Sequence, residues 1–347
     1  MILFKIVEPL LFREGGEIDP WISGVYSSAK STIFPSPSTL VGAVATYFKE
    51  QGSKLDVEAR TWYDEILSLI PDEVIFKGPF LKIGRKVYVG SKEKEEVYDL
   101  EVLIEYINHK KEELWNELVE GPHVKENVLK ELKAAFKYNN VLLERTSIGL
   151  NRKTRTVKKG LLYTLRLVDF SGILKKYKIS TSKVAFFLET KNFYKEFKVV
   201  SNLGGRGRIA IIETSTESII DKFLDDAKYK KYILYFVSDC LIKQSVPSDL
   251  KKVFEESFVT WDWIFLSKIF ERKAYIKGGK ISIGVKGAGF SLRKKVRKPI
   301  YTALFNGSLL AVEFEEKVSP MELFWEEPAK SEAWKLGFGT FIPFPVE

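Results

Sequence analysis

The chain has 347 residues, of which 45% are hydrophobic and 14% aromatic. This composition excludes a disordered chain and supplies the cores of one large domain or two ordinary ones. The net charge of +9 is moderate for this length, so it indicates a polyanionic partner only where basic residues cluster.

The first segments of the chain predict a strand, a loop and a helix. "ILFKIVEPLLF" is rich in branched and aromatic residues and ends near Pro9, as a strand would. In "PSPSTLVGAVATYFKE", Ser36 can cap a helix and Pro37 suits its first position. Apolar residues then recur four apart at Leu40, Val44 and Phe48. We expect Gly42, Ala43 and Ala45, on its other faces, to let this helix pack closely on a sheet.

The N-terminus and the cysteine content bear on the cellular compartment. "MILFKIVEPLLF" is too short and too interrupted by charge for a signal peptide or a membrane span, so we expect a cytoplasmic protein without a membrane partner. Cys240 is the single cysteine, and it lies in the apolar run "YILYFVSDCLI", which predicts a buried, inert thiol. Few Gln and Met beside abundant Lys and Glu favour a thermophile, which we expect to be archaeal.

The middle of the chain predicts a helical insertion and a long hairpin. A helix over about 56–69 precedes a strand pair formed by "EVIFKGPFLKIG" and "KVYVG". Residues 99–138 have a helical pattern that breaks at Gly121 and Pro122. Two strand-like runs, "VLLERTSIGL" and "GLLYTLRLV", are then joined by "NRKTRTVKK". This arrangement predicts a finger over 145–166 with a basic tip.

The second half of the chain is rich in strand-like runs. "TSTE" at 214–217 has the pattern of a capping box and predicts a helix to about 227. Strands are expected near 281–286 and 308–315. "SNLGGRGRIAII" at 201–212 and "AWKLGFGTFIPF" at 333–344 each place Leu-Gly and a further Gly before an apolar run. This echo arises either by chance or because the chain holds two copies of one α+β unit.

Residues suited to catalysis are sparse. His109 lies in a charged helical segment and His123 follows Gly-Pro, so we expect neither isolated imidazole to form an active site. The carboxylates of Asp19, Asp225 and Asp226 have no partners that the pattern would bring beside them as metal ligands. No phosphate loop ends in Gly-Lys-Ser/Thr. We therefore predict no enzyme activity, no cofactor and no metal site.

Basic residues, in contrast, gather in two places. The finger, "RTSIGLNRKTRTVKKGLLYTLR", has seven basic residues and no acidic one. "SLRKKVRKP" at 291–299 has five basic residues. Each run alone is typical of a solvated loop, but the two together favour a polyanionic partner. Apolar residues of the finger such as Ile148 and Val157 would press against bases, which suits a single strand or a distorted duplex.

The segment "LGGRGR" adds a third candidate. Gly204 and Gly205 permit backbone amides to approach a phosphate, and Arg206 and Arg208 supply positive charge. An ordinary tight turn before a strand would have the same composition. We therefore treat this loop as support for the basic runs rather than as a site in its own right.

Several further patterns follow one another along the chain. "FKIVEPLLFREGG" precedes "IFPSPSTLVGAVATYF", and "ERTSIGLNRKTRTVKKGLLYT", "LGGRGRIA", "WDWIFLSK" and "NGSLLAVEF" come later. In this order they resemble the RAMP-superfamily subunit that caps the 5′ end of the guide in type III-B (Cmr) CRISPR effector complexes. The N-terminal block is the most specific. Arg206 stands where the family commonly has an acidic residue.

The resemblance implies an α+β fold with two ferredoxin-like (RRM-like) domains. The first would span residues 1–213 and carry the helical insertion at about 99–138 and the basic finger at 145–166. The second would span residues 214–347. The implied function is a non-catalytic subunit that binds the 5′ repeat-derived tag of crRNA in antiviral defence. Its implied partners are crRNA and the guide–target RNA duplex, the large polymerase/cyclase subunit and the backbone RAMP subunits.

Under this hypothesis the glycine loop and the N-terminus of the first helix hold phosphates, while the two basic runs contact RNA. The candidate RNA-binding residues are Arg13, Ser36, Ser38, Thr39, Arg145, Ile148, Arg152, Lys153, Arg155, Lys158, Gly204, Gly205, Arg206, Arg208, Arg293, Lys294 and Arg297.

Two alternatives remain open at this point. One is the equivalent subunit of the related type III-A (Csm) complex, which has the same chemistry; the longer chain with a helical insertion favours type III-B. The other is a metal-independent endoribonuclease of the same superfamily that processes precursor crRNA, for which His123 or Tyr163 would have to act as the general base.

Overall fold

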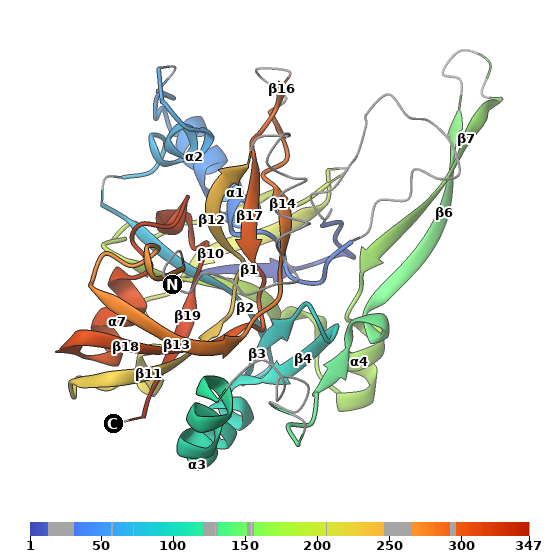
Figure 1. Cartoon of the computed structure of the whole chain (residues 1–347). Helices are drawn as coiled ribbons and strands as arrows, with labels where there is room; N and C mark the ends of the chain where they lie inside the picture. Colours follow the sequence, from blue (N-terminus) through green and yellow to red (C-terminus); the bar gives the residue numbers. More distant parts are fainter. Residues whose placement is uncertain are drawn as a thin grey trace.

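Strands make up most of the regular structure, and helices are few (Figure 1). The computed structural model describes residues 1–12, 31–56, 58–71, 73–120, 129, 131–150, 154, 156–205, 207–245, 266–291 and 296–346. Within these ranges, no helix has both the length and the apolar character needed to cross a bilayer.

The strands are β1 (Ile2–Ile6), β2 (Ile75–Ile83), β3 (Lys86–Ser91), β4 (Glu96–Asp99), β5 (Phe136–Lys137), β6 (Leu142–Leu150), β7 (Val157–Val168), β8 (Val184–Lys191), β9 (Lys198–Asn202), β10 (Ile209–Thr214), β11 (Tyr229–Phe236), β12 (Cys240–Ser245), β13 (Ala274–Lys280), β14 (Ile283–Gly287), β15 (Phe290–Ser291), β16 (Val296–Arg297), β17 (Ile300–Leu304), β18 (Leu309–Val318) and β19 (Phe341–Pro345). The α-helices are α1 (Pro37–Glu50), α2 (Trp62–Leu67), α3 (Leu100–Val119), α4 (Ser171–Tyr177) and α7 (Pro320–Glu326). Short 3-10 turns are η1 (Tyr138–Asn140), η2 (Thr181–Lys183), η3 (Asp221–Phe223) and η4 (Trp334–Leu336).

The described residues form one large sheet in the first half of the chain. Its strand order is β5-β4-β3-β2-β8-β1-β10-β9, with every neighbouring pair antiparallel. At its centre, Phe4 of β1 lies opposite Phe186 of β8 on one side and Ile212 of β10 on the other. Burial on both faces explains why β8 is apolar almost throughout.

The second half repeats part of this order. Its four-stranded antiparallel sheet runs β13-β18-β11-β19. In the large sheet, β2-β8-β1-β10 follows the same rule. If the four strands of each set are counted along the chain, both sheets place them side by side in the order second, third, first, fourth. The glycine turns of the sequence echo directly precede β10 and β19, which are corresponding strands in the two orders. The second half also contains a three-stranded sheet, β12-β17-β14.

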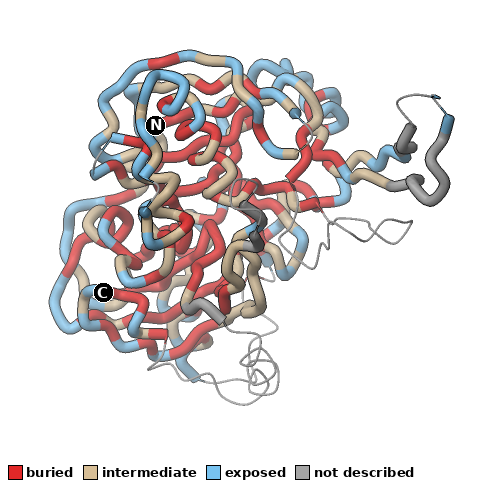
Figure 2. Tube along the Cα trace, turned by 90° about the horizontal axis from the view of Figure 1, so that it is seen from above, coloured by how far each residue is buried: buried red, intermediate tan, exposed pale blue. Residues whose placement is uncertain are grey.

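The two sheets stack, and the helices cover their faces. One face of the large sheet packs on α1 through side chains such as Phe4 and Phe186. The other face contributes Phe187 to a core shared with α3 and with Tyr235 and Ile342 of the four-stranded sheet. Figure 2 shows these buried residues filling the interior, while the β6–β7 ladder extends away from it. Cys240 is buried, as expected, and burial raises the pKa of its thiol to about 12.

Polar contacts join the two halves across this core. The Lys77 ammonium, on β2, donates to the backbone oxygen of Glu327 at 2.6 Å and is fully buried. The neighbouring Gly78 N–H donates to the Thr340 hydroxyl at 2.9 Å. These contacts lie in the interior, where a hydrogen bond is stronger than it would be in water. These hydrogen bonds therefore fix the position of the two halves relative to each other.

The prediction of a helix from the "TSTE" segment is wrong. Thr214 belongs to β10, and its hydroxyl accepts a hydrogen bond from Phe197 N–H at 3.0 Å. The amides of Ile219 and Ile220 donate instead to the buried carboxylate of Glu189 on β8, at 2.7 and 3.1 Å. Because a distant carboxylate takes these amides, the segment forms turns and the short η3.

Two other expectations need correction. Within the predicted helical insertion, α3 covers Leu100–Val119, whereas Phe136 and Lys137 form strand β5 beside β4 instead of a helix. Gly42 of α1 has no atom within 4 Å of where a Cβ would stand, so it does not serve close packing. The small residues of α1 that are buried are Ala43 and Ala45.

Candidate nucleic-acid interface

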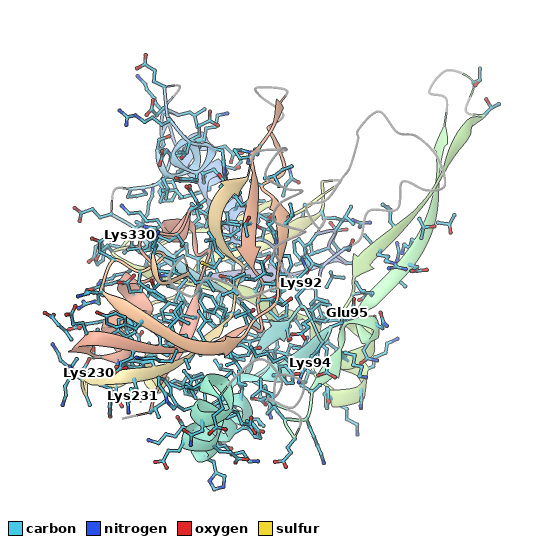
Figure 3. All side chains as sticks on the ribbon, in the orientation of Figure 1. Lys92, Lys94, Glu95, Lys230, Lys231 and Lys330 are labelled. Atoms are coloured by element: carbon cyan, nitrogen blue, oxygen red, sulfur yellow. The ribbon has the colours of Figure 1, made fainter. Side chains whose placement is uncertain are left out.

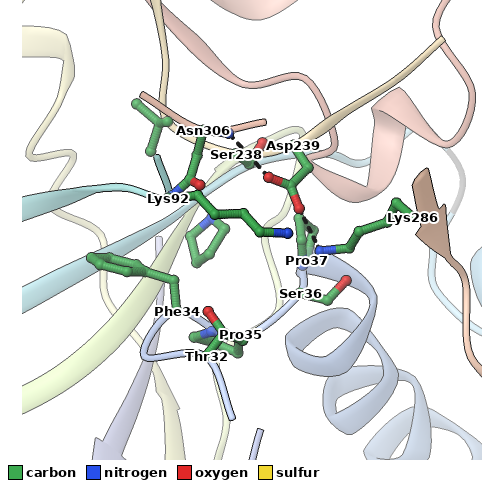
Figure 4. Close-up of a pocket in the computed structure, with 12 residues that line it drawn as sticks. Thr32, Phe34, Pro35, Ser36, Pro37, Lys92, Ser238, Asp239, Lys286 and Asn306 are labelled. Carbon is green, nitrogen blue, oxygen red and sulfur yellow. Dashed lines mark hydrogen bonds and ion pairs between the residues drawn. The ribbon is translucent and has the colours of Figure 1, made fainter. Parts of the chain in front are cut away.

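The N-terminus of α1 opens into a small pocket between the two halves (Figure 4). The pocket has a volume of about 30 Å³, room for about two water molecules, so it suits the oxygens of one phosphate rather than a whole nucleotide. Its lining residues are Thr32, Phe34, Pro35, Ser36, Pro37, Pro79, Lys92, Val237, Ser238, Asp239, Lys286 and Asn306. Sequence segments from both halves thus meet at one helix end.

The N-terminus of α1 lies at this pocket, with Ser36 and Pro37 in its lining. Ser36 is the N-cap residue, but its side chain accepts no backbone hydrogen bond and lies 3.1 Å from the Ser38 hydroxyl. The Thr39 N–H donates to the Ser36 backbone oxygen at 2.8 Å. No acidic residue occupies the first turn. An uncapped helix N-terminus of this kind favours an anion, because its N–H groups and the helix dipole point outward.

Charged side chains from the second half and from β3 complete the pocket. Asp239 forms an ion pair with Lys286 and accepts a hydrogen bond from the Asn306 N–H at 3.0 Å. Burial would raise the pKa of Asp239, but the nearby charges of Lys286 and Lys92 outweigh it, so the pKa lies below its usual value. With two lysines and one ionised carboxylate, the pocket keeps one net positive charge. Lys92 also lies 3.6 Å from the Phe305 ring centroid.

A glycine fixes how closely the halves approach at this point. Gly307 has a φ of +88°, and a Cβ there would lie 2.4 Å from the Ser91 hydroxyl oxygen. Only glycine accommodates both this backbone conformation and this contact. The turn at 305–307 can therefore press against the end of β3, and the Lys92 N–H reaches the Asn306 oxygen at 3.2 Å.

The glycine loop is largely occupied by contacts within the chain. Gly204 has a φ of +80°, and the Gly205 N–H donates to the Leu11 oxygen at 2.8 Å. Arg208 forms an ion pair with Glu8 at 2.5 Å, and Glu8 also accepts the Ile209 N–H at 2.8 Å. The hydrogen bond from the Ile209 N–H has the largest effect on the pKa of Glu8 and lowers it, and the bond from Arg208 lowers it further. The amide of Gly205 and the charge of Arg208 are thus engaged, and Arg206 lies outside the described residues.

The β6–β7 ladder carries the predicted finger. Its strands pair antiparallel from Leu142 opposite Val168 to Leu150 opposite Val157. Leu10 exchanges backbone hydrogen bonds with Val168, which anchors the base of the ladder to the chain that follows β1. Arg145 is exposed on β6. Arg152, Lys153 and Arg155 lie outside the described residues, as do Arg13 and the side chains of Ile148 and Lys158.

The second basic run is partly structural. Lys298 places its ammonium 4.7 Å from the Trp62 ring centroid, and burial lowers its pKa. Strands β15 and β16 pair before it, with Phe290 opposite Arg297. Arg293, Lys294 and the side chain of Arg297 lie outside the described residues.

Comparison with known proteins assigns the chain to a family. The family model described as CRISPR-associated protein (Cas_Cmr3) matches residues 85–343. The chain belongs to the Cas_Cmr3 family. The match includes the pocket residues Lys92, Asp239 and Lys286, and it begins after β1 and α1. The N-terminal block, which carries the most specific part of the sequence resemblance, therefore stands outside the matched residues.

Individual relatives of this Cas_Cmr3 chain match over most of its length. The CRISPR system CMR subunit Cmr3 of Saccharolobus solfataricus is 23% identical over 317 residues, covering 89% of this chain and 85% of the relative. A chain of the type III-B Cmr-beta complex bound to cognate target RNA and AMPPnP superposes with a TM-score of 0.57 at 20% identity, covering 89% and 85%. A chain of that complex bound to cognate target RNA gives 0.55 at 21% identity, covering 89% and 86%. At these identities the structural likeness is one of fold.

Of the candidate catalytic residues of the sequence, the structure describes the side chain of His109 alone. His109 lies exposed on α3. His123 and the side chain of Tyr163 lie outside the described residues. Among the described residues, no three His, Cys, Asp or Glu side chains form a group suited to hold a metal ion.

The lysines and the carboxylate of the pocket were missed by sequence reasoning. Lys92 follows β3, Asp239 follows β11 and Lys286 lies on β14. Their spacing along the chain carries no pattern. One local signal was present, because the polar pair Ser238-Asp239 directly ends the long apolar run of β11, where a strand delivers side chains to the edge of a sheet.

Proposed function

We propose that this chain is a non-catalytic, cytoplasmic RNA-binding subunit of a type III-B CRISPR effector complex. It would bind the 5′ repeat-derived tag of crRNA and bridge the large polymerase/cyclase subunit to the backbone RAMP subunits in antiviral defence. Membership of the Cas_Cmr3 family supports the placement in a CRISPR system. The similar chains in the type III-B Cmr-beta complex bound to cognate target RNA support the assembly and the RNA ligand.

The repeated strand order supports a pair of ferredoxin-like units. A ferredoxin-like sheet sets its first strand between the third and the fourth, all antiparallel, and both β2-β8-β1-β10 and β13-β18-β11-β19 follow this order. In the first unit, α1 joins the first strand to the second, as such a unit requires. The β6–β7 ladder and α3 are then insertions between its second and third strands, which is where the finger of the sequence hypothesis belongs.

The observation that carries the RNA-binding proposal is the pocket at the N-terminus of α1. Two lysines and several hydroxyls converge there at a helix N-terminus, where the helix dipole favours an anion such as a phosphate. Ser36, Ser38 and Thr39, which the sequence singled out, lie in or beside this first turn. Such a pocket would fix one phosphate of the tag and thereby the register of the guide on the protein.

The test is direct binding of a guide strand with and without its tag. Fluorescence anisotropy should show the wild-type chain binding the tagged RNA more tightly, and Lys92→Ala with Lys286→Ala should remove most of that preference. A matched control, Lys230→Ala with Lys317→Ala, removes two exposed lysines elsewhere and should leave the preference intact. Equal affinity of the wild type for both RNAs would refute tag recognition.

The endoribonuclease alternative has its own decisive experiment. Incubating the pure chain with repeat RNA in the presence of a chelator should leave the RNA uncut. Cleavage at a defined position that His123→Ala or Tyr163→Phe abolishes would overturn the non-catalytic proposal. The type III-A alternative predicts instead that the chain copurifies with Csm subunits, so mass spectrometry of native complexes separates the two assemblies.

A further inference from the structure

A second basic surface lies away from the pocket, at the base of the β6–β7 ladder. It is formed by the turn between β2 and β3 (residues 82–86) and by α4 with the loop after it (residues 171–183), and we name it the α4 patch. These two segments hold seven basic residues and no acidic one. They lie side by side, because the Gly84 N–H donates to the Lys183 oxygen at 2.9 Å and Gly84 faces the Ile179 side chain.

Most of this charge is unpaired. Lys86 pairs with Asp99 at 2.6 Å. The other six basic residues form no ion pair with any residue in the described part of the chain; they are Lys82, Arg85, Lys175, Lys176, Lys178 and Lys183. Elsewhere on the molecule some exposed lysines have a carboxylate partner, such as Glu213 for Lys198 and Glu322 for Lys228. Like charges gathered without counter-charges repel one another, so the arrangement costs stability unless an anion binds.

Helix energetics explain only part of the charge. Lys175 and Lys176 lie in the last turn of α4, where cations interact favourably with the helix dipole. Lys178, with a φ of 54°, already lies outside the helix, and Lys183 and Arg85 belong to other elements. The backbone that carries them is fixed by hydrogen bonds from Ile179 N–H to Leu174 and from Lys183 N–H to Ser180, at 3.0 Å each. The charges are therefore presented from an ordered surface.

An aromatic ring stands among these charges. Tyr177 is 49% exposed, and the Lys176 ammonium lies 5.6 Å from its ring centroid. Ser180, Thr181 and Ser182 add exposed hydroxyls in the loop. Cations, hydroxyls and an exposed ring are the groups with which proteins hold single-stranded nucleic acid without sequence preference: the charges track phosphates while the ring stacks on a base.

The α4 patch is continuous with the β6–β7 ladder. Strand β7 ends at Val168 and α4 begins at Ser171, so the two elements adjoin (Figure 1). A hollow beside them is lined by Val168, Ser171 and Thr181, and also by the acidic residues Glu8 and Asp169. A nucleic-acid strand bound along the ladder and continuing toward the body of the protein would reach the α4 patch next.

We propose that the α4 patch binds single-stranded RNA through its phosphates, with Tyr177 stacking on one base. This proposal rests on the RNA-binding function proposed above and adds a second contact surface to it. The contact would be independent of sequence, because phosphates and a stacked ring carry little sequence information. It would extend the grip on a strand beyond the pocket and the ladder.

The experiment measures binding of a fluorescent oligouridine single strand to the full chain as salt is raised. A variant with Lys175→Ala, Lys176→Ala, Lys178→Ala and Lys183→Ala should bind more weakly and lower the slope of log affinity against log salt by up to about 3, since each phosphate contact on a single strand contributes about 0.7. The control removes Lys49, Lys230, Lys317 and Lys335, exposed lysines without a described ion pair. Figure 3 shows Lys230 at the opposite side of the molecule from α4. Equal loss in both variants would overturn the proposal, because it would reduce the effect to net charge.

Single substitutions at Tyr177 test the stacking step. Tyr177→Ala should reduce affinity several-fold and abolish photo-crosslinking of 4-thiouridine-containing RNA to the 171–183 peptide, whereas Tyr177→Phe should retain both. A patch variant that binds oligouridine as the wild type does would refute the proposal while leaving tag recognition in place. If that variant instead fails to retain an acidic protein subunit, the patch is a protein contact. Failure of the wild-type chain to bind any RNA would refute this proposal and the proposed function together.

Discussion

Replacing Lys77 by methionine tests what it costs to enclose a cation between the two halves. The Lys77 side chain is fully buried and donates to a backbone oxygen of Glu327 at 2.6 Å, with the Trp334 ring centroid 5.4 Å away. Burial lowers its pKa from 10.5 to about 7. Since a tenfold change in a protonation equilibrium corresponds to about 1.4 kcal/mol, keeping this ammonium charged in the folded chain costs about 5 kcal/mol below pH 7.

The pH dependence follows from this direction. Below pH 7 folded and unfolded chains both carry the proton on Lys77, and the folded chain bears the full cost. Between pH 7 and 10.5 the unfolded chain binds more protons, so the free energy of unfolding rises with pH by about 1.4 kcal/mol per pH unit from this group. Lys77→Met removes the cost but leaves the Glu327 oxygen without its donor, which offsets about 1–3 kcal/mol.

We therefore expect Lys77→Met to stabilise the chain by about 2–4 kcal/mol at pH 6 and to lose about 3 kcal/mol of that advantage by pH 9. Urea unfolding followed by circular dichroism at both pH values measures the difference. Lys317→Met, on an exposed part of β18, serves as the control and should behave alike at the two pH values. A stability difference between Lys77→Met and the wild type that stays constant from pH 6 to 9 would refute the reasoning, because the buried charge would then not be its source.

Three further substitutions test the elements that hold the pocket and the second half in place. Gly307→Ala should destabilise the chain by about 2–4 kcal/mol, through the left-handed backbone and the contact with Ser91; Gly52→Ala, with a similar φ but open space around it, should cost only about 1 kcal/mol in the same urea titration. Asp239→Asn should cost about 3–5 kcal/mol at pH 7 because it leaves Lys286 enclosed without its partner. Since the pKa of Asp239 is lowered, its contribution is present above about pH 4 and is lost in acid, so unfolding curves of wild type and variant should converge as pH falls. Ser319→Ala removes the oxygen that accepts the Glu322 N–H at the start of α7, which should lower the unfolding free energy by about 1 kcal/mol, and Ser319→Asp should restore it.

Elements whose information is local were predictable from the sequence. The Ser36-Pro37 start and the four-residue apolar spacing gave α1 its correct first residue. Branched and aromatic runs correctly indicated β1 and β18 in the same way. In each of these segments, the neighbours that decide the backbone conformation lie within a few residues.

Elements decided by distant partners were not predictable. The segment after Thr214 has the local pattern of a helix start, but the Glu189 carboxylate, which belongs to another strand, takes the amides that a cap would hold. The pocket depends on the same kind of contact. Lys92, Asp239 and Lys286 meet because the three sheets that contain β3, β11 and β14 pack around the end of α1, and no spacing in the sequence expresses that packing.

The glycine echo has a physical reason that connects the two halves. In each half the last strand lies antiparallel beside the first, so the turn before the last strand must press against the chain that leaves the first. In the first half, a Cβ at Gly204 would lie 2.5 Å from the Leu11 oxygen. In the second half, the Gly339 N–H donates to the backbone oxygen of Asp239 at 2.9 Å. Gly339 has a φ of +73°, and a Cβ there would lie 2.8 Å from Pro328 Cγ, so glycine suits both turns although the approaching atoms differ.

The side chains that leave the two first strands are used differently. Glu8, after β1, forms an ion pair with Arg208 beside the glycine loop of the same half and so neutralises that charge. Asp239, after β11, pairs with Lys286 at the mouth of α1, where Lys92 adds a second cation and leaves the pocket positive. One arrangement thus closes its loop on itself, while the other brings an ion pair to a helix N-terminus of the opposite half. Because the charges of Asp239 and Lys286 cancel, the net positive charge of the pocket is that of Lys92 in the first half, and the second half contributes the other wall of the pocket.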